Sequence, residues 1–308
     1  MNGRGGHLNK KKKPLTGSQK TYHLMMLPGM LFLLVFSYVP MAGIVMAFQD
    51  YVPSKGIFGS PFAGLEHFRY MLELPDISQV IKNTLVIALG KIILGTLAAI
   101  SFSILLNEIR IKYIKKWVQT IVYLPHFLSW VVLASVVVNL FNLDGSVNQF
   151  LAGIGLERIN FLGSSRWFQP LIIGTDVWKE FGYNSVVYLA AITSIDPGLH
   201  EAAAMDGATW WKRVLHITIP GMMPIILLMA AMNLTSILSA GFDQIYNLYT
   251  PLVYQTGDIL DTYVYRIGLI GRQYSFATAV GLFKSLIAMI LMVGANEAAK
   301  RFADRKIF

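Results

Sequence analysis

Three long runs without Asp, Glu, Lys or Arg constrain what this chain can fold into more than any other feature of its sequence. They cover residues 24–49, 117–143 and 214–242, which are 26, 27 and 29 residues long. About 20 apolar residues in a helix cross the hydrocarbon core of a bilayer, so each run is long enough to span a membrane. Only 14% of the residues are charged, against about 25% in a typical soluble domain. The sequence therefore predicts an all-α, polytopic membrane protein and excludes a soluble one.

The apolar segments predict six transmembrane helices in a single domain, residues 24–299. Three of these helices carry isolated charges and are less apolar than the others. The first helix follows the basic run 10–13, but it is too long for the apolar region of a signal peptide and lacks a cleavage site of small residues. The expected helices cover residues 24–49, 80–106, 118–141, 169–194, 220–243 and 276–299.

The distribution of Lys and Arg over the loops predicts the orientation of these helices. The tails 1–23 and 300–308, with the loops 107–117 and 195–219 on the same side, hold 16 basic residues, whereas the three loops on the other side hold 6. Cytoplasmic loops of membrane proteins carry the excess of Lys and Arg, so both tails are expected in the cytoplasm. The formal net charge of +9 mostly reflects this asymmetry, and we expect no nucleic-acid partner.

The sequence carries no motif for catalysis or metal binding. It has no cysteine, no G-x-x-x-x-G-K-[ST] phosphate-binding loop and no H-E-x-x-H motif. The six histidines show no metal-ligand spacing, and the serines lack the G-x-S-x-G context of a nucleophile. We therefore expect no catalytic residue, no metal, no cofactor and no nucleotide hydrolysis by this chain itself.

The loop 195–219 is the most informative segment. Asp196 is a good N-cap and is followed by a proline, which suits the first position of a helix. Gly207 can take the left-handed conformation that ends a helix, and Thr209 can cap a second one. The alanines at 202–204 leave little side-chain bulk, so a partner's backbone can approach closely. The loop is expected to form two short helices at the cytoplasmic surface.

This loop resembles the EAA signature of the permeases of binding-protein-dependent ABC importers, written E-A-A-x3-G-x9-I-x-L-P. One position departs from it, because Ile219 stands where the signature has Leu. The alternative is an ordinary amphipathic helix that joins two membrane helices. The resemblance assigns coupling to an ATPase to Glu201, Ala202, Ala203, Asp206, Gly207, Ile217 and Pro220.

The resemblance implies the permease fold of type I ABC importers, in the cytoplasmic membrane of a bacterium. In that family two permease chains, commonly two different ones, form the pathway above two ATP-binding cassette ATPase subunits. An extracellular solute-binding protein delivers the cargo. The helix 201–207 would dock into a groove of the ATPase and convert ATP-driven closure of the ATPase pair into alternating access.

Two further segments indicate the cargo by resemblance. Residues 62–68 and 83–85 are similar to the outer loop and second-helix start of carbohydrate-importing permeases, although His67 stands where Asn is more common. Residues 123–130, Tyr-Leu-Pro-His-Phe-Leu-Ser-Trp, look like the subgroup that handles oligosaccharides from complex polysaccharides. The resemblance therefore implies import of oligosaccharides.

Charged residues within the expected helices suggest where the cargo passes. A charge at the centre of a membrane helix costs about 2.5 to 3.5 kcal/mol on insertion scales, so such residues usually face a cavity or one another. Three lysines meet two acids, Asp176 and Glu180, at similar depth, which leaves one cation for an acidic cargo such as a uronic acid unit. Candidates for the pathway, with aromatic rings and amides nearby, are Lys91, Trp178, Lys179, Glu180, Tyr183, Asn184, Tyr188, Asn233 and Lys284.

These polar residues have a structural interpretation as well. The charges could pair with one another to orient helices or face the partner permease, and the aromatic rings could be packing residues. Asp176 and Lys179 lie three residues apart on one helix face, a spacing that favours an ion pair. We therefore expect this pair to be structural.

Two other transport functions and one enzymatic function remain as alternatives at this stage. An ABC permease for another solute, such as glycerol phosphate, would share the coupling loop. A secondary transporter driven by an ion gradient would be expected to show inverted repeats with broken helices, which we do not find. A membrane-embedded enzyme would need a paired catalytic constellation, which is also missing.

Overall fold

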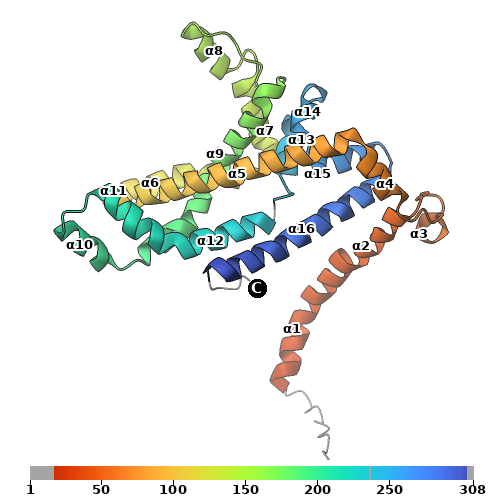
Figure 1. The fold of residues 1–308 in the computed structure, drawn as a ribbon, viewed down its shortest axis with the longest axis horizontal. Helices are drawn as coiled ribbons and strands as arrows, with labels where there is room; N and C mark the ends of the chain where they lie inside the picture. The colour runs from red at the N-terminus through yellow and green to blue at the C-terminus, as the bar shows by residue number, and fades with distance from the viewer. Residues whose placement is uncertain (1–16, 236, 304–308) are drawn as a thin grey trace, which may run out of the picture.

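A computed structural model describes residues 17–235 and 237–303 of the chain, and within these ranges the fold is helical (Figure 1). One isolated bridge joins Gln49 and Phe62 in antiparallel fashion. The prediction of an all-α fold is confirmed for the described residues. Five helical segments are long and apolar enough to cross a membrane: Lys20–Phe48, Pro75–Glu108, Trp130–Gly153, Trp210–Leu234 and Tyr274–Gly294.

The first of these segments is a continuous rod that stands apart from the bundle. It consists of α1 (Gly17–Leu33), a π turn (Leu34–Tyr38), α2 (Val39–Met41) and a 3₁₀ turn (Ala42–Phe48). Its C-terminal end contacts the last helix, α16 (Tyr274–Ala303), whereas α1 projects away from the other helices (Figure 1). Only 6% of the apolar part of the rod is buried within the chain. The rod therefore needs lipid or another protein around it.

Two long helices form the centre of the bundle. They are α5 (Pro75–Glu108) and α9 (Ser165–Thr193), and they make the most extensive contact between elements in the described part of the chain. α9 is long enough to span a bilayer but carries Asp176, Lys179 and Glu180 in its middle. These three charges are why it is absent from the helices that qualify as spans by composition.

The prediction of one straight helix over 118–141 is wrong. α6 (Lys112–Tyr123) ends at a 3₁₀ turn (Leu124–Phe127), and α7 (Trp130–Phe141) begins after Ser129. Pro125 lies in this turn and lacks a backbone N–H donor, and Leu128 and Ser129 are extended, with ψ of 138° and 151°, which interrupts the helix. The Ser129 side chain then accepts a hydrogen bond from the Val132 backbone N–H at 3.4 Å, which caps the new helix.

The predicted helix 220–243 is also shorter than expected. α12 (Ile219–Thr235) ends eight residues early, and α13 (Phe242–Leu248) starts after Gly241. Gly241 has a φ of +96°, a conformation that L side chains rarely adopt. The chain between these helices passes close to Lys91, whose Nζ would lie 2.7 Å from a Cβ on Gly241.

The remaining helices are short and lie in the connections. On the side of the α5 N-terminus are α3 (Gly56–Gly59) and α4 (Glu66–Glu73). α8 (Ser146–Gly153) follows α7 and extends away from the bundle with it (Figure 1). Beyond α13 come a 3₁₀ turn (Pro251–Val253), α14 (Tyr254–Gly257), α15 (Leu260–Val264) and a π turn (Tyr265–Ile270).

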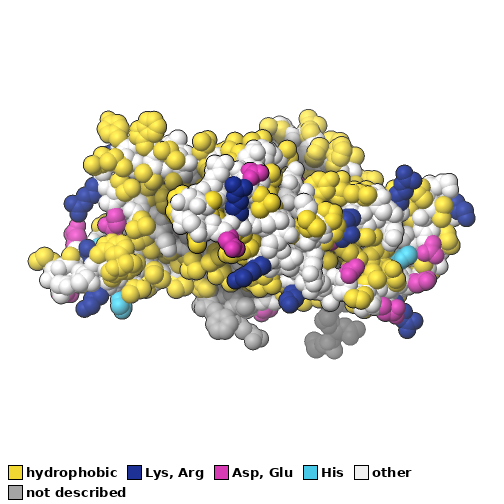
Figure 2. All heavy atoms as spheres, turned by 90° about the horizontal axis from the view of Figure 1, so that it is seen from above, with side chains coloured by type: hydrophobic (Ala, Val, Ile, Leu, Met, Phe, Trp, Pro, Cys, Tyr) yellow, Lys and Arg dark blue, Asp and Glu magenta, His cyan; other side chains and the backbone are white. Residues whose placement is uncertain are grey.

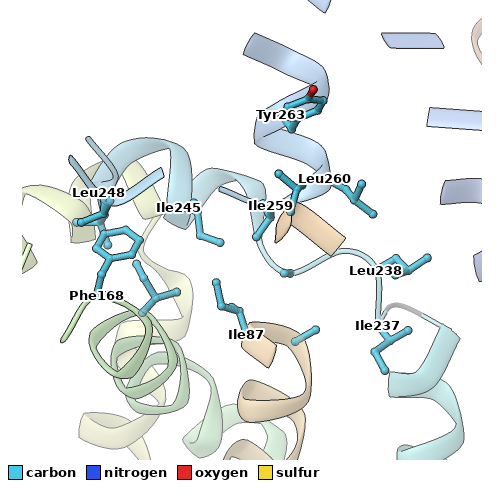
Figure 3. Packing of buried hydrophobic residues seen from close by; sticks show 14 of the residues in the cluster. Ile87, Phe168, Ile237, Leu238, Ile245, Leu248, Ile259, Leu260 and Tyr263 are labelled. Atoms are coloured by element: carbon cyan, nitrogen blue, oxygen red, sulfur yellow. The ribbon is translucent and has the colours of Figure 1, made fainter. Parts of the chain in front are cut away.

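A hydrophobic core fixes these short segments on α5 and α9. In Figure 3 the buried side chains of α13 and α15 converge on Ile87 of α5 and Phe168 of α9. Phe168 is fully buried, and a Cβ on Gly257 would lie 2.4 Å from its ring. Burial of apolar area stabilises this arrangement by about 25 cal/mol per Å².

The outside of the molecule is largely apolar. Hydrophobic side chains cover much of the face in Figure 2, and many charged side chains lie toward its two ends. Large apolar residues on the membrane helices are exposed, such as Phe32 and Phe36 on the first rod and Ile290 on α16. A surface of this kind is stable only against lipid or a partner protein, because exposed apolar area in water is unfavourable.

Candidate functional site

The first candidate site is the short helix α10 (Pro197–Met205) in the loop that resembles the EAA signature. The Asp196 side chain accepts a hydrogen bond from the Gly198 backbone N–H at 2.9 Å, so this N-cap forms as the sequence predicts. Pro197 occupies the first helical position, where its missing N–H costs nothing. The start of α10 is therefore set by its own sequence.

The end of α10 is set by Gly207. Its φ is +76°, the Ala208 N–H bonds the Ala203 carbonyl at 2.9 Å, and the Gly207 N–H bonds the Ala204 carbonyl at 3.1 Å. These two bonds form a Schellman motif, in which glycine takes the left-handed position. The chain then turns into α11 (Trp210–Arg213), which continues through a π turn (Val214–Thr218) into α12. Thr209 stands at the N-cap of α11 but makes no side-chain capping bond.

The surface of α10 is open. Glu201, Ala202 and Asp206 are exposed, and Met205 at the end of the helix is 89% exposed. In Figure 1, α10 and α11 lie together at one end of the bundle. Ile217 is half-buried in the π turn, and Pro220 is exposed in the first turn of α12. The residues predicted to couple to an ATPase thus lie on an accessible helix and on the segment that connects it to α12.

The second candidate site is a polar cluster between α5, α9 and the break after α12. Lys91 Nζ lies 3.0 Å from Asp176 Oδ1 on α9 and donates to the Ala240 carbonyl at 2.8 Å. It also donates to the side-chain carbonyl of Gln244 on α13. One cation therefore joins three elements. Gln244 in turn donates from its amide to the Ile172 carbonyl and to Thr175, at 2.8 and 2.9 Å.

One helical turn further along α9, a second polar group connects α9 to the turn before α7. Lys179 Nζ lies 2.7 Å from Glu180 Oε1 and donates to the His126 carbonyl at 2.9 Å. Glu180 Oε2 lies 2.6 Å from His126 Nδ1. The His126 ring stacks on Tyr183 with centroids 3.9 Å apart and an interplanar angle of 2°. The Lys179 ammonium thus satisfies the backbone carbonyl of His126, at the point where the helix breaks.

Two small cavities adjoin the Lys91 and Asp176 pair. One, of about 150 Å³, brings together Glu180, Asn184, Tyr188 and Asn233, four of the predicted pathway residues. The other, of about 200 Å³, reaches Ser239 and Gly241 at the break after α12. Both are lined by amides, hydroxyls and charges, which suits a cargo rich in hydroxyl groups. Each is smaller than an oligosaccharide.

Lys284 lines neither cavity, although it neighbours Ser239 of the second, and it has its own carboxylate partner. Its Nζ forms an ion pair with Asp261 on α15 and lies 3.3 Å from the Ser239 hydroxyl. Each of the three membrane lysines is therefore paired with a carboxylate. The prediction of one surplus cation is wrong, because it counted only two acids and placed Asp261 in an outer loop.

The expected ion pair between Asp176 and Lys179 is also wrong. Asp176 pairs with Lys91 and Lys179 pairs with Glu180. Spacing on one helix shows which side chains can meet, but in the folded chain the partner of Asp176 is Lys91, a cation on the neighbouring helix α5. Trp178 likewise lies outside the polar cluster: it is 48% exposed and borders an apolar groove between α7 and α9.

A third polar group lies around α15, next to α5. The buried Asp258 forms an ion pair with Arg266 and accepts from the Thr262 hydroxyl at 2.7 Å. Burial raises the pKa of Asp258, while Thr262 and Arg266 oppose that shift. Burial and the neighbouring Tyr254 also raise the pKa of Tyr249. Asn83, at the start of α5, donates to the Asp258 carbonyl at 3.1 Å and holds this group in place.

Several side chains that contact the predicted charges were not predicted from the sequence. His126, Gln244 and Asp261 each contact a predicted charge, yet each lies in a turn or short helix that was expected to be a straight helix or a loop. A proline directly before His126 and a glycine before α13 were the available signals. No group of three or more potential metal-ligating side chains occurs in the part of the chain that the structure describes.

Comparison with known proteins identifies the family. Residues 99–305 match the family model described as binding-protein-dependent transport system inner membrane component. The chain belongs to this family. It is 43% identical over 291 residues to the polygalacturonan/rhamnogalacturonan transport system permease protein YteP of Bacillus subtilis (strain 168). This match covers 94% of this chain and 91% of that protein.

Solved structures of alginate importers are similar to the whole chain. One is a bacterial ABC transporter involved in the import of the acidic polysaccharide alginate, with a TM-score of 0.85, 39% identity and coverage of 92% of this chain and 96% of that one. The other is an alginate ABC transporter in complex with an alginate pentasaccharide-bound periplasmic protein, with a TM-score of 0.86, 39% identity and coverage of 94% and 97%.

Family membership confirms the general predictions from the sequence. The chain is a transport component rather than an enzyme, and it is a multi-pass protein of the bacterial cytoplasmic membrane. It works in a binding-protein-dependent system, so its partners include a solute-binding protein, a partner permease and ATPase subunits. The helical fold of ABC importer permeases, expected from the EAA-like loop, is confirmed as well.

Proposed function

We propose that the chain is the permease subunit of an ATP-driven importer for oligosaccharides that contain uronic acid units. The observation that carries this proposal is the similarity along nearly the whole chain to permeases named for polygalacturonan/rhamnogalacturonan and for alginate. Each of these named polymers contains acidic sugars. Lys91, Lys179 and Lys284 do not themselves indicate an acidic cargo, because each is paired with a carboxylate.

The proposed topology has six crossings, with both tails in the cytoplasm. Five helices qualify as spans by composition, and α9, with 29 residues and its charges turned toward α5 and the 124–127 turn, supplies the sixth. Residues 24–299 then form one membrane domain, with the loop 195–219 inside the cell between α9 and α12. The tails 1–23 and 300–308 are basic, as the positive-inside rule expects.

In this proposal the helix α10 transmits the movement of the ATPase. Its exposed Glu201, Ala202 and Met205 would dock into a groove of the ATPase, with small side chains that allow close approach. α11 and the π turn containing Ile217 carry the displacement to Pro220 and α12. Asn233, two residues before the end of α12, borders the cavity beside Lys91 and Asp176, so a shift of α10 would reach the cavity through α12.

The polar cluster would line the pathway that the cargo follows. Glu180, Asn184, Tyr188 and Asn233 offer hydrogen-bonding groups to sugar hydroxyls. The ion pairs of Lys91 and Lys179 position the helices and keep the site polar. Lys284 forms a separate ion pair with Asp261 on α15, in the segment proposed to lie on the outer side of the membrane.

Uptake by the reconstituted importer tests this function. The permease, its partner permease, the ATPase subunits and the binding protein are placed in proteoliposomes with ATP inside, and entry of a labelled galacturonate tetrasaccharide is measured. We expect uptake that requires ATP and is competed by unlabelled tetrasaccharide but not by a neutral oligosaccharide of equal length or by glycerol 3-phosphate. Equal competition by the neutral oligomer would contradict the acidic cargo, and uptake without ATP would contradict the ATP-driven mechanism.

A further inference from the structure

An aromatic cluster surrounds α13, outside the residues already assigned to coupling or to the pathway. Phe242 and Tyr246 stack with centroids 5.2 Å apart and an interplanar angle of 13°. Tyr265 packs edge-on against Tyr246 at 5.0 Å, and Tyr249 lies 6.2 Å from Tyr246. Tyr254 continues the cluster 4.9 Å from Tyr249. Four rings thus follow one another from the break after α12 to the start of α14, and Tyr265, from the π turn after α15, packs against two of them.

One face of α13 is polar and exposed around these rings. Asp243, Tyr246 and Asn247 are exposed, at spacings of three and four residues, which places them on one side of the helix. Tyr246 is 38% exposed, whereas Phe242, Tyr249, Tyr254 and Tyr265 are partly buried. A face with a carboxylate, an amide and a hydroxyl is too polar to lie in lipid.

The opposite face of α13 is fixed rigidly. Ile245 and Leu248 are buried in the core that α13 shares with Phe168 of α9 (Figure 3). Gln244 connects the start of the helix to Lys91 and to Thr175. The Tyr246 ring is therefore held in place by its neighbours before any ligand arrives, which lowers the entropy that binding would cost.

α13 is continuous with the polar cluster. The cavity of about 200 Å³ that contains Lys91 and Asp176 also contacts Ser239, Ala240 and Gly241, the residues directly before α13. A chain molecule that leaves this cavity on the side of the break would pass Phe242 and then Tyr246. The aromatic cluster thus begins directly after the residues that border this cavity.

We propose that this face of α13, with Tyr246 at its centre, is a stacking platform for sugar rings of the cargo at the outer side of the polar cluster. Pyranose rings present C–H groups on one face, which pack on the apolar faces of aromatic rings, while Asp243, Asn247 and the tyrosine hydroxyls meet the sugar hydroxyls. The proposal rests on the proposed oligosaccharide cargo and adds a site to it. Its role is to hold successive sugar units as the oligosaccharide enters.

The test compares three substitutions in the complete importer, with the galacturonate tetrasaccharide as probe. Tyr246→Ala and Tyr246→Leu remove the ring, and Leu keeps an apolar side chain, whereas Tyr246→Phe keeps the ring and loses only the hydroxyl. We expect the Ala and Leu variants to lose about tenfold in uptake efficiency, and the Phe variant to stay within about twofold of wild type. Stimulation of ATP hydrolysis by the loaded binding protein should be unchanged in all three.

Three results would overturn the platform. Wild-type uptake by Tyr246→Leu would show that the ring is not used. Loss of ATPase stimulation in parallel with uptake would make Tyr246 a contact of the binding protein instead. Failure of the Ala and Leu variants to co-purify with the partner permease would make it a packing residue. The oligosaccharide function itself is tested separately. If the wild-type importer shows no ATP-dependent uptake of the tetrasaccharide, the proposed function is wrong.

Discussion

At the scale of single residues, the membrane charges are arranged as pairs between elements. Lys91 pairs with Asp176 across two helices, Lys179 pairs with Glu180 beside the 124–127 turn, and Lys284 pairs with Asp261. The sequence predicted that three of the lysines would lie in helices and near acids, because a lone charge in a bilayer is costly. It did not predict the partners, because partners from different helices depend on packing and not on spacing.

The pair of Lys91 and Asp176 can be tested as a structural or a cargo contact. Lys91→Met leaves a buried carboxylate without its cation and is expected to destabilise the permease by about 3 kcal/mol, whereas Lys91→Met with Asp176→Leu removes both charges and recovers most of that loss. Thermal unfolding of the purified permease pair measures both. Uptake of the tetrasaccharide then shows whether the recovered double variant still transports.

The outcomes separate the two interpretations of the pair. A stable double variant with normal uptake means that the pair only orients α5 and α9. A stable double variant with impaired uptake supports its place in the pathway. A single variant Lys91→Met as stable as wild type would contradict the burial and pairing described for Lys91.

At the scale of elements, the helices themselves were predicted well and their breaks were not. The expected ranges 80–106 and 169–194 fall on α5 and α9, because long apolar runs and their flanking polar residues define both ends. The turn at Leu124–Phe127 and the end of α12 at Thr235 were missed. Both breaks lie inside charge-free runs, 117–143 and 214–242, so only Pro125 and Gly241 marked them, and their effect depends on contacts with α9 and Lys91.

The coupling loop was predicted in more detail than the pathway. The caps of α10 at Asp196 and Gly207 follow from local sequence, and both form as expected. The polar cluster is a tertiary feature: it needs α5, α9, α12 and the break after α12 to meet. Residues such as Gln244 and His126 join it through that meeting, which no short window of sequence encodes.

The close approach of α6 and α9 at Gly182 gives a prediction at this scale. A Cβ on Gly182 would lie 2.4 Å from the Val122 carbonyl oxygen, whereas a Cβ on Gly174 of the same helix would meet no atom within 4 Å. Gly182→Ala should therefore separate α6 from α9 and destabilise the permease by about 1 to 3 kcal/mol. Gly174→Ala should be neutral or stabilising, because alanine favours a helix over glycine by about 1 kcal/mol.

Thermal unfolding of the two alanine variants is the measurement, with wild type as reference. Because both changes add one methyl group to α9, the difference between them isolates the contact with Val122. Equal unfolding temperatures for the two variants would contradict the packing of α6 on α9 at this point.

For the whole molecule, the proposed function requires a particular orientation of the chain in the membrane. The exposed rod of α1, the apolar belt in Figure 2 and the basic tails fit a chain that crosses the membrane six times next to a partner permease. The chain has no cysteine, so single cysteines can be introduced without removing any. Phe58, which is 104% exposed near α3, is expected outside, and Tyr113, which is 81% exposed at the start of α6, is expected inside.

Labelling with a membrane-impermeant thiol reagent tests this orientation. Phe58→Cys should react in intact cells, whereas Tyr113→Cys should react only after the membrane is permeabilised. The chain is purified after labelling so that thiols of other proteins do not contribute. Reaction of Tyr113→Cys in intact cells would place the α6 end outside and would contradict the proposed topology.

The most direct test of the whole account is whether α10 couples an ATPase to this permease. In the reconstituted importer with its loaded binding protein, Glu201→Lys is compared with wild type for stimulated ATP hydrolysis and for uptake, after co-purification confirms that the permease pair has assembled. The account predicts that an assembled Glu201→Lys importer loses both the stimulation and the uptake, because a cation on the exposed face of α10 disrupts docking. Stimulation equal to wild type in that variant would contradict it.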